Sequence, residues 1–201
     1  MKRGWEFLLF LCVANTAFAG AQKYEPLAAS VRAALHAAIS DRRPPTSSFQ
    51  NPVEAANWLE EMSVRLAKRM PSQESRLEFL RAAHYEAKRA GLDPQLVLGL
   101  IQVESGFKKY AISSAGARGY MQVMPFWVRQ IGDRNDNLFH LRMNLRYGCT
   151  ILKHYLDIEK GDLFRALGRY NGSLGRPEYP DAVRAAWERH WDYRPKAATN
   201  P

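Results

Sequence analysis

The residue with the clearest chemical potential in this sequence is Glu104. It ends an apolar helical stripe whose other members recur at helical spacing: Leu96, Val97, Leu100 and Ile101. Partial desolvation and the partial negative charge at a helix C-terminus both disfavour a carboxylate, so both raise its pKa. The pattern predicts an acid that holds its proton near neutral pH and can donate it to a leaving oxygen. Periodicity alone leaves a second interpretation open, in which Glu104 lies at a frayed helix end and faces solvent.

The elements around Glu104 read almost entirely as helices, so the sequence predicts an all-α fold. Asn51, Pro52 and Glu54 form the N-cap, first-turn proline and capping box of one helix, and Asp93 caps the helix that carries Glu104. The loop at 111–123 is long and structured, with room for a small ribbon. The predicted helices cover residues 26–40, 51–70, 72–90, 93–105, 125–131, 141–159, 162–170 and 178–190.

The N-terminal residues 1–19 have the features of a signal peptide. Lys2 and Arg3 precede a short apolar run, and small residues surround Phe18 at the predicted cleavage site. The run is too short to cross a bilayer, which takes about 20 apolar residues. We therefore expect secretion across the inner membrane into the periplasm, without a transmembrane segment. Cys12 follows large residues, which argues against a lipid anchor.

Composition divides the rest of the chain into three parts. Residues 20–50 are predicted to be an N-terminal extension and linker, because Asp41 begins a stretch rich in Arg, Pro and Ser that ends at Ser48. Residues 51–195 then form one globular domain, and residues 196–201 a tail. The region before about residue 50 is therefore interpreted as an extension that can be mobile. Cys149 is the one cysteine beyond the signal peptide and is expected to be a small core residue.

The charge balance favours anionic partners without identifying one. The chain has 29 Lys and Arg against 20 Asp and Glu, a net charge of +9. A nucleic acid, a cell-wall polymer with carboxylates and a merely solvated basic surface all fit this value. The sequence contains no recognised nucleic-acid motif or aromatic-basic stripe, so we expect no nucleic-acid partner. No metal site and no cofactor are predicted.

Several motifs follow one another along the middle of the chain. They are Glu104-Ser105-Gly106-Phe107, Ala111, Ser113, Gly116-Ala117, Gly119, Met121-Gln122-x-Met124-Pro125, the helix with Asn144, Gly148 and Leu152, and Tyr170-Asn171. In this order they resemble the soluble lytic transglycosylase (SLT) domain family, and the resemblance covers roughly residues 80–175, about half of the chain. Tyr120 departs from the family's aliphatic residue, and Gly172-Ser173 stand where the family has Ala-Gly, which leaves the detailed subsite contacts open.

The resemblance implies a lysozyme-like helical domain that cleaves the MurNAc–GlcNAc bond of peptidoglycan glycan strands. It makes Glu104 the catalytic acid and base, and Ser105 the neighbour that helps to orient it. Met121 and Gln122 become glycan contacts in the loop. Tyr170 becomes the tyrosine whose phenol approaches the acid, with Asn171 as a further amide for the sugar. Alternatives remain: Met121 and Met124 as core residues, and Tyr170 as a core aromatic residue with a satisfied hydroxyl.

The number of carboxylates bears on the type of reaction. Ordinary glycosidases use two, but the segment from Glu104 to Pro125 contains no second acid, and Asp133 and Asp136 lie in a polar run that reads as a surface turn. A single acid suffices if the C6 hydroxyl of the sugar attacks, which gives a 1,6-anhydro product. The sequence thus favours a lytic transglycosylase. The alternatives are a lysozyme-type hydrolase and a non-catalytic peptidoglycan-binding module. Recruitment to a cell-envelope machine stays open.

Overall fold

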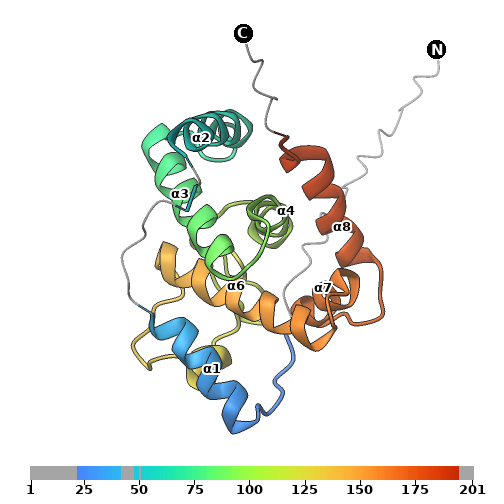
Figure 1. Cartoon of the computed structure of the whole chain (residues 1–201). Coiled ribbons are helices and arrows are strands. Elements are labelled where there is room, and N and C mark those ends of the chain that lie inside the picture. Colours follow the sequence, from blue (N-terminus) through green and yellow to red (C-terminus); the bar gives the residue numbers. More distant parts are fainter. Residues whose placement is uncertain (1–21, 42–47, 50, 195–201) are drawn as a thin grey trace, which may run out of the picture.

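The computed structural model describes residues 22–41, 48–49 and 51–194. These residues form eight α-helices and one short π-helix, which confirms the all-α prediction, and each predicted helix is present with shifted ends (Figure 1). The predicted signal peptide with Cys12, most of the predicted linker and the tail lie outside the described residues. The elements are α1 (Ala29–Ser40), α2 (Pro52–Leu66), α3 (Gln73–Arg89), α4 (Pro94–Ser105), α5 (Phe126–Ile131), α6 (Leu141–Ile158), α7 (Leu163–Asn171), α8 (Glu178–Ala186) and the π-helix η1 (Trp187–Trp191).

The predicted helix starts are confirmed by their caps. The Asn51 side chain accepts from the Glu54 N–H at 2.7 Å, and the Asp93 carboxylate accepts from the Gln95 N–H at 2.7 Å. Asp162 caps α7 in the same way. Each cap satisfies a backbone donor that the helix itself leaves unpaired. The helix that carries Glu104 therefore begins at a defined residue.

Helix α4 lies in the interior of the helical assembly and is covered by α3, α8 and η1 (Figure 1). Five of its apolar residues are almost completely buried, and Gly99 allows η1 to come close. A Cβ at position 99 would lie 2.9 Å from the backbone nitrogen of Trp187. Because protein interiors are densely packed, this contact leaves no room for a side chain. Packing along the whole length of α4 thus fixes its C-terminal end, which carries Glu104.

The loop between α4 and α5 is pinned by a side chain of α6. The Asn144 Oδ1 accepts from the Met121 N–H at 2.8 Å, and its Nδ2 donates to the Arg118 and Leu138 carbonyls at 2.9 and 2.8 Å. Two isolated β-bridges, Ile112–Arg118 and Arg118–Val123, form the expected small ribbon. The long loop is therefore a structured element, as predicted.

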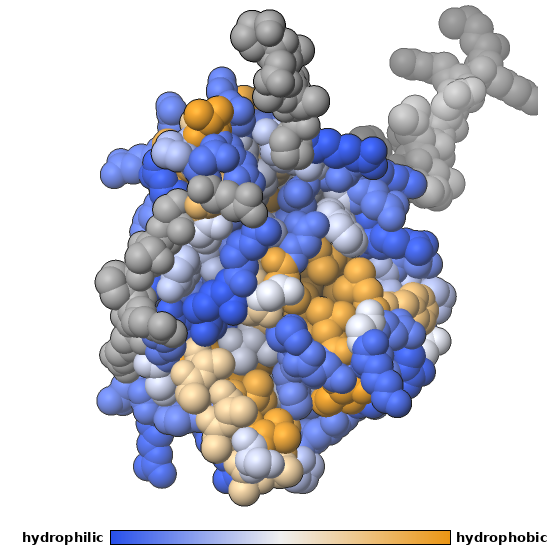
Figure 2. Space-filling view, in the orientation of Figure 1, coloured by the Kyte–Doolittle hydropathy of each residue, from blue (hydrophilic) through white to orange (hydrophobic). Residues whose placement is uncertain are grey.

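The described residues before position 50, which the sequence analysis treats as an extension, contact the domain. Helix α1 contacts α5 and α6, yet Ile39 is its one buried residue. Figure 2 shows pale apolar surface where α1 lies at the bottom of the view, and a stronger apolar area near the middle of the face, around α6 and α7. The apolar contacts of α1 with the core come from Ile39 and the partly buried Leu35.

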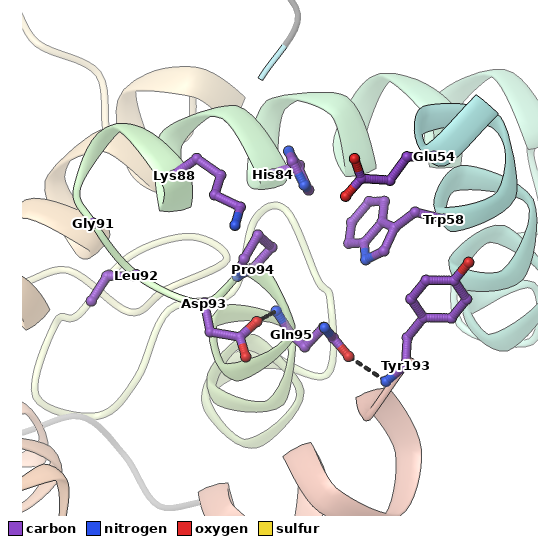
Figure 3. Close-up of a pocket in the computed structure, with 10 residues that line it drawn as sticks. All are labelled: Glu54, Trp58, His84, Lys88, Gly91, Leu92, Asp93, Pro94, Gln95 and Tyr193. Carbon is purple, nitrogen blue, oxygen red and sulfur yellow. Dashed lines mark hydrogen bonds between the residues drawn. The ribbon is translucent and has the colours of Figure 1, made fainter. Parts of the chain in front are cut away.

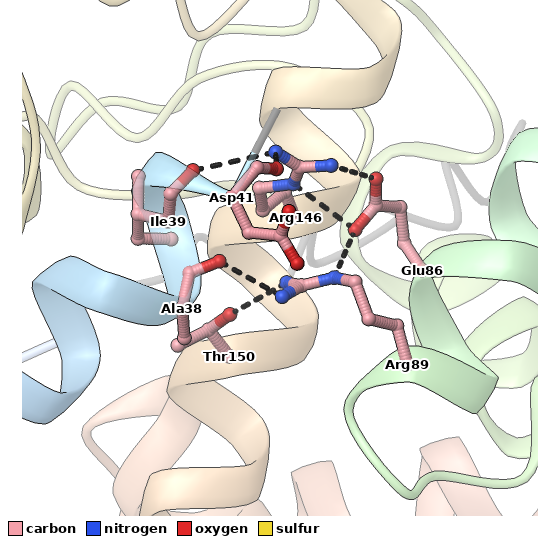
Figure 4. A network of polar contacts seen from close by, with 7 residues as sticks. All are labelled: Ala38, Ile39, Asp41, Glu86, Arg89, Arg146 and Thr150. Atoms are coloured by element: carbon pink, nitrogen blue, oxygen red, sulfur yellow. Dashed lines mark hydrogen bonds and ion pairs between the residues drawn. The ribbon is translucent and has the colours of Figure 1, made fainter. Parts of the chain in front are cut away.

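A buried ionic network holds the C-terminal end of α1 (Figure 4). Glu86 is fully buried between Arg146, at 2.9 Å, and Arg89, at 2.8 Å. The Arg89 guanidinium also donates to the Ala38 carbonyl at 2.8 Å, and that of Arg146 donates to the carbonyls of Ile39 and Asp41. These carbonyls end a helix and lack partners within it. The local composition predicted a linker here. It could not reveal these contacts, because the two arginines lie far away in the sequence.

Two further observations concern the described part of the chain. Cys149 is fully buried within α6, which confirms its predicted place in the core. In the ranges that the structure describes, no helix has both the length and the apolar composition that a membrane span requires.

Candidate active site

The carboxyl group of Glu104 lies at the C-terminal end of α4 and is buried. The residue is 9% exposed, so the interpretation as a solvent-facing glutamate at a frayed end is wrong. The Tyr179 hydroxyl, from α8, donates to Glu104 Oε1 at 2.5 Å. The other oxygen, Oε2, is buried without a hydrogen-bond partner. One carboxyl oxygen is thus held by the protein, and the other makes no hydrogen bond.

Burial sets the protonation of this acid. It raises the pKa of Glu104 to about 8, while the hydrogen bond from Tyr179 opposes part of the shift. Among the described residues, no second charged side chain contributes to this shift. The prediction of a raised pKa is confirmed. Glu104 is therefore protonated near neutral pH, as a general acid must be.

The phenol that hydrogen-bonds to the acid belongs to Tyr179, whereas the resemblance implies Tyr170 as the tyrosine whose phenol approaches it. The Tyr170 hydroxyl donates to the Met121 carbonyl at 2.7 Å, and the residue is fully buried in α7. Tyr170 nevertheless lies near enough to Glu104 for the carboxylate to raise its pKa, after the larger effect of burial. Tyr179 was missed because nothing in its local sequence relates it to a glutamate 75 positions away.

Ser105 follows the acid but does not orient it through the contacts seen here. Its hydroxyl donates to the Tyr120 carbonyl at 2.7 Å and to the Ile101 carbonyl at 3.2 Å. It therefore fastens the loop to the last turn of α4. Tyr120 itself is 6% exposed and packs 4.9 Å from Phe79, so it is a core residue and offers no stacking surface.

The side chains of Met121 and Gln122 point into the protein. Met121 is fully buried, and a Cβ at Gly148 would lie 2.3 Å from its sulfur, so glycine is required there for packing. Gln122 has φ +48° and its Nε2 donates to the Gly119 carbonyl at 2.9 Å. Met124 is partly exposed, in contrast to Met121. Contacts of residues 121 and 122 with a glycan stay predictions.

Asn171 lies at the end of α7, next to Tyr170. The residue is 7% exposed, and its Nδ2 is buried without a hydrogen-bond partner. Buried polar atoms are nearly always paired, so the unpaired donor of Asn171 and the unpaired Glu104 Oε2 both indicate a place for a ligand or a water molecule. Gly172 follows with φ +83° as the left-handed end of α7, a conformation that favours glycine and accounts for the departure at this position.

The carboxylates that could assist Glu104 have other roles. Asp136 accepts from the Tyr147 hydroxyl at 2.7 Å and from the Asp133 N–H at 3.0 Å, so it holds the turn at 133–136 to α6. Glu86 belongs to the ionic network of α1. In the described ranges, no cluster of three or more His, Cys, Asp or Glu side chains is placed to hold a metal ion.

A cavity of about 520 Å³ lies at the other end of α4 (Figure 3). Trp58, His84 and Tyr193 line it, and Lys88 and Glu54 point toward it. Burial and the nearby Lys88 lower the pKa of His84 to about 4, so its imidazole is neutral. Helix α4 separates this cavity from Glu104 by about 15 Å, because each residue advances an α-helix by about 1.5 Å. The cavity is distinct from the site of the acid.

Known proteins resemble parts of this chain. It is 34% identical over 88 residues to a transglycosylase of Enterobacteria phage PRD1, which covers 44% of this chain and 32% of the phage protein. Membrane-bound lytic murein transglycosylase C of Actinobacillus pleuropneumoniae serotype 5b (strain L20) is 48% identical over 48 residues, 24% of this chain and 13% of that protein. The protein of that name from Haemophilus influenzae (strain PittEE) is 56% identical over 39 residues, 19% of this chain and 11% of the relative.

The matched parts are short, and the alignments span about a third or less of these relatives. The match to a family is broader. Residues 81–183, about half of the chain, match the model of the transglycosylase SLT domain. This range contains the acid, the pinned loop and both tyrosines. The chain therefore belongs to the transglycosylase SLT domain family.

Proposed function

We propose that this protein is a peptidoglycan lytic transglycosylase that cleaves the β-1,4 bond between MurNAc and GlcNAc. One observation carries the proposal: Glu104 is a buried acid with its pKa raised to about 8 and one free carboxyl oxygen. Family membership and the names of the matched relatives support the substrate class. The signal-peptide features of residues 1–19 support a place in the periplasm, where peptidoglycan is found.

In the proposed reaction Glu104 acts twice. Its protonated carboxyl donates the proton to the glycosidic oxygen, and the C1–O bond breaks while the N-acetyl oxygen of the muramoyl residue stabilises the developing cation. The C6 hydroxyl of the same sugar then attacks C1 and gives its proton to the Glu104 carboxylate. The acid is regenerated, no water is consumed, and the product ends in 1,6-anhydroMurNAc. Intramolecular attack has a large proximity advantage, which offsets the lack of a second carboxylate.

Tyr179 positions the acid in this scheme. Its hydroxyl holds Oε1, which leaves Oε2 to meet the glycosidic oxygen. The same hydrogen bond stabilises the carboxylate and keeps the pKa of Glu104 from rising further. The group that donates a proton in the first step can then exist as a base in the second.

The test is the mass of the products released from purified sacculi. We expect muropeptides that end in 1,6-anhydroMurNAc, which are lighter than hydrolytic products by one water, about 18 Da. Glu104→Gln keeps the shape of the side chain but has no proton to donate, so release should fall by at least about 10²–10⁴-fold. Mass spectrometry of the soluble fraction measures both quantities.

Three results would contradict parts of the proposal. Mainly reducing-end products would favour the lysozyme-type hydrolase. A Glu104→Gln variant within a few-fold of wild type would remove Glu104 from its role. Binding to sacculi without any release would leave the non-catalytic module. The matched control is Asp136→Asn, whose amide oxygen can still accept from Tyr147; its product yield should be unchanged.

A further inference from the structure

The segment before α1 places one side chain beside the acid's site. Gln22 is 4% exposed, and its Oε1 accepts from the Trp127 indole N–H at 3.0 Å and the Met124 backbone N–H at 3.3 Å. Burial is the largest effect that raises the pKa of Tyr170, and the nearby Glu104 raises it further. The Gln22 amide lowers the pKa of Tyr170. Tyr170 thus lies within the influence of both side chains. A residue from far outside the family domain thus binds the end of the loop that follows the acid.

Weaker contacts hold the residues that follow. The Tyr24 ring lies edge-on to Phe126 with centroids 5.6 Å apart, although Tyr24 is 63% exposed. The Glu25 carboxylate lies 3.5 Å from Arg169, and its backbone carbonyl accepts from Gln130 at 2.9 Å. These are surface contacts, and an exposed ion pair contributes little to stability. Apart from Gln22, the segment is therefore held loosely.

The chemistry of the Gln22 side chain matches that of the proposed substrate. A primary carboxamide on a methylene has the same carbonyl acceptor as the N-acetyl group of GlcNAc and MurNAc. The Gln22 carbonyl accepts from two N–H donors, those of Met124 and Trp127. The same two donors could bind the carbonyl of an acetamide.

We propose that residues 22–25 are an intramolecular occupant of a glycan subsite formed by the N–H groups of Met124 and Trp127, and that an N-acetylated glycan takes the place of the Gln22 carboxamide. The inference rests on the proposed function, since it names a contact of the same substrate. The segment competes with the glycan for the N–H groups of Met124 and Trp127. Its presence lowers the apparent glycan affinity by the fraction of molecules in which the subsite is free.

The way the chain is anchored permits such an exchange. The ionic network holds the C-terminal end of α1, and Leu27 packs against the core, so α1 can stay docked while residues 22–25 detach. This stretch has no regular secondary structure whose hydrogen bonds would have to break. Displacement therefore costs mainly the contacts of Gln22 and the few surface contacts of Tyr24 and Glu25.

The test uses tri-N-acetylchitotriose, a soluble carrier of N-acetyl groups, and isothermal titration calorimetry. Glu104→Gln is present in every protein so that no turnover occurs. Adding Gln22→Ala removes the two hydrogen bonds by which the segment competes for the subsite. The Kd for chitotriose should therefore become about tenfold tighter. Gln73→Ala, at an exposed glutamine of α3, is the matched control and should leave the Kd unchanged.

A second measurement needs no change to the segment. Lys23 is exposed, and trypsin should release the N-terminal peptide faster when chitotriose has displaced the segment. The inference would be overturned if Gln22→Ala left the Kd for chitotriose unchanged. It would also be overturned if trypsin cleaved at Lys23 at the same rate with and without chitotriose. Neither result depends on turnover, so failure of the proposed reaction would be recognised separately, from the muropeptide products.

Discussion

The two groups that decide the chemistry at the residue scale act on each other in opposite directions. Burial raises the pKa of Glu104, and the Tyr179 phenol opposes the rise by stabilising the carboxylate. In return, burial and the Glu104 carboxylate raise the pKa of Tyr179, so this phenol stays protonated and remains a donor. A group with this balance can lose and regain a proton at neutral pH, which a single acid-base catalyst requires.

Removal of the Tyr179 hydroxyl tests this balance. In Tyr179→Phe the carboxylate loses a donor, so the pKa of Glu104 rises and the alkaline limb of the kcat/KM profile should move to higher pH. We also expect turnover at neutral pH to fall by about tenfold or more, because the carboxyl group loses its orientation. Tyr170→Phe is the control: its phenol serves the Met121 carbonyl, so the limb should stay in place. If the alkaline limb of the kcat/KM profile lies at the same pH in Tyr179→Phe and in wild type, the positioning role is contradicted.

The raised pKa also predicts how stability depends on pH. Between the ordinary glutamate pKa of 4.5 and the folded value of about 8, the folded protein holds a proton that the unfolded chain has lost. Stability from this group is therefore full below 4.5 and is lost as the pH rises through 8, at up to about 1.4 kcal/mol per unit. Glu104→Gln lacks this loss, so its advantage in urea unfolding should grow from pH 5 to pH 8. A constant difference over that range would show that Glu104 is not protonated in the folded state.

At the scale of the elements, the position of the loop depends on α6. Asn144 supplies three hydrogen bonds to loop backbone groups, and Gly148 one turn later leaves space for Met121. The Met121 carbonyl is also the acceptor for Tyr170 of α7. Side chains of α6 and α7 thus hold the loop, and their hydrogen bonds go to its backbone groups.

Asn144→Ala should therefore be strongly destabilising. It leaves the Met121 N–H and the Leu138 carbonyl without partners, and each can cost about 1–3 kcal/mol, whereas the Arg118 carbonyl keeps its hydrogen bond from the Val123 N–H. We expect the free energy of unfolding to fall by about 3 kcal/mol or more in urea titration, with loss of activity. Asn135→Ala, in an exposed turn, should stay within about 0.5 kcal/mol of wild type. A similar small effect in both variants would mean that water replaces Asn144.

At the scale of the whole molecule, the family domain and the segment before it form one packed unit in the described residues. Helix α1 buries little apolar surface, and its carbonyl end is held by two arginines that share Glu86. The partners come from α1, α3 and α6, so the network joins elements far apart in the sequence (Figure 4). The domain boundary near residue 50 that composition favours stays a prediction. The contacts of the network cross this boundary, because they join α1 to α3 and α6.

Breaking this network should cost more than breaking a surface pair. Glu86→Gln leaves two buried guanidinium groups without their counter-charge, and removal of one partner of a buried ion pair costs about 3–5 kcal/mol. Urea unfolding should show a loss of this order. Glu61→Gln is the matched control, because its pair with Arg65 is 45% exposed on the glutamate side and should contribute at most about 1 kcal/mol. If the two variants lose the same stability, the network is not what holds α1.

The sequence by itself determined the features that depend on neighbours along the chain. Helix positions, caps such as Asn51 and Asp93, the structured loop and the acid at the end of an apolar stripe follow from local spacing and side-chain chemistry. Motif order in the segment from Glu104 to Asn171 identified the family. These properties could be predicted because each depends on residues a few positions apart.

Only the tertiary structure decided which distant groups meet. The phenol of Tyr179 rather than Tyr170 reaches Glu104, the side chain of Met121 is buried, and Gln22 lies in a niche with Trp127. In each case the partners are tens of residues apart and lie on different elements, so no spacing relates them. Which of two tyrosines faces the acid depends on how α7 and α8 pack against α4, and that packing is a property of the whole core.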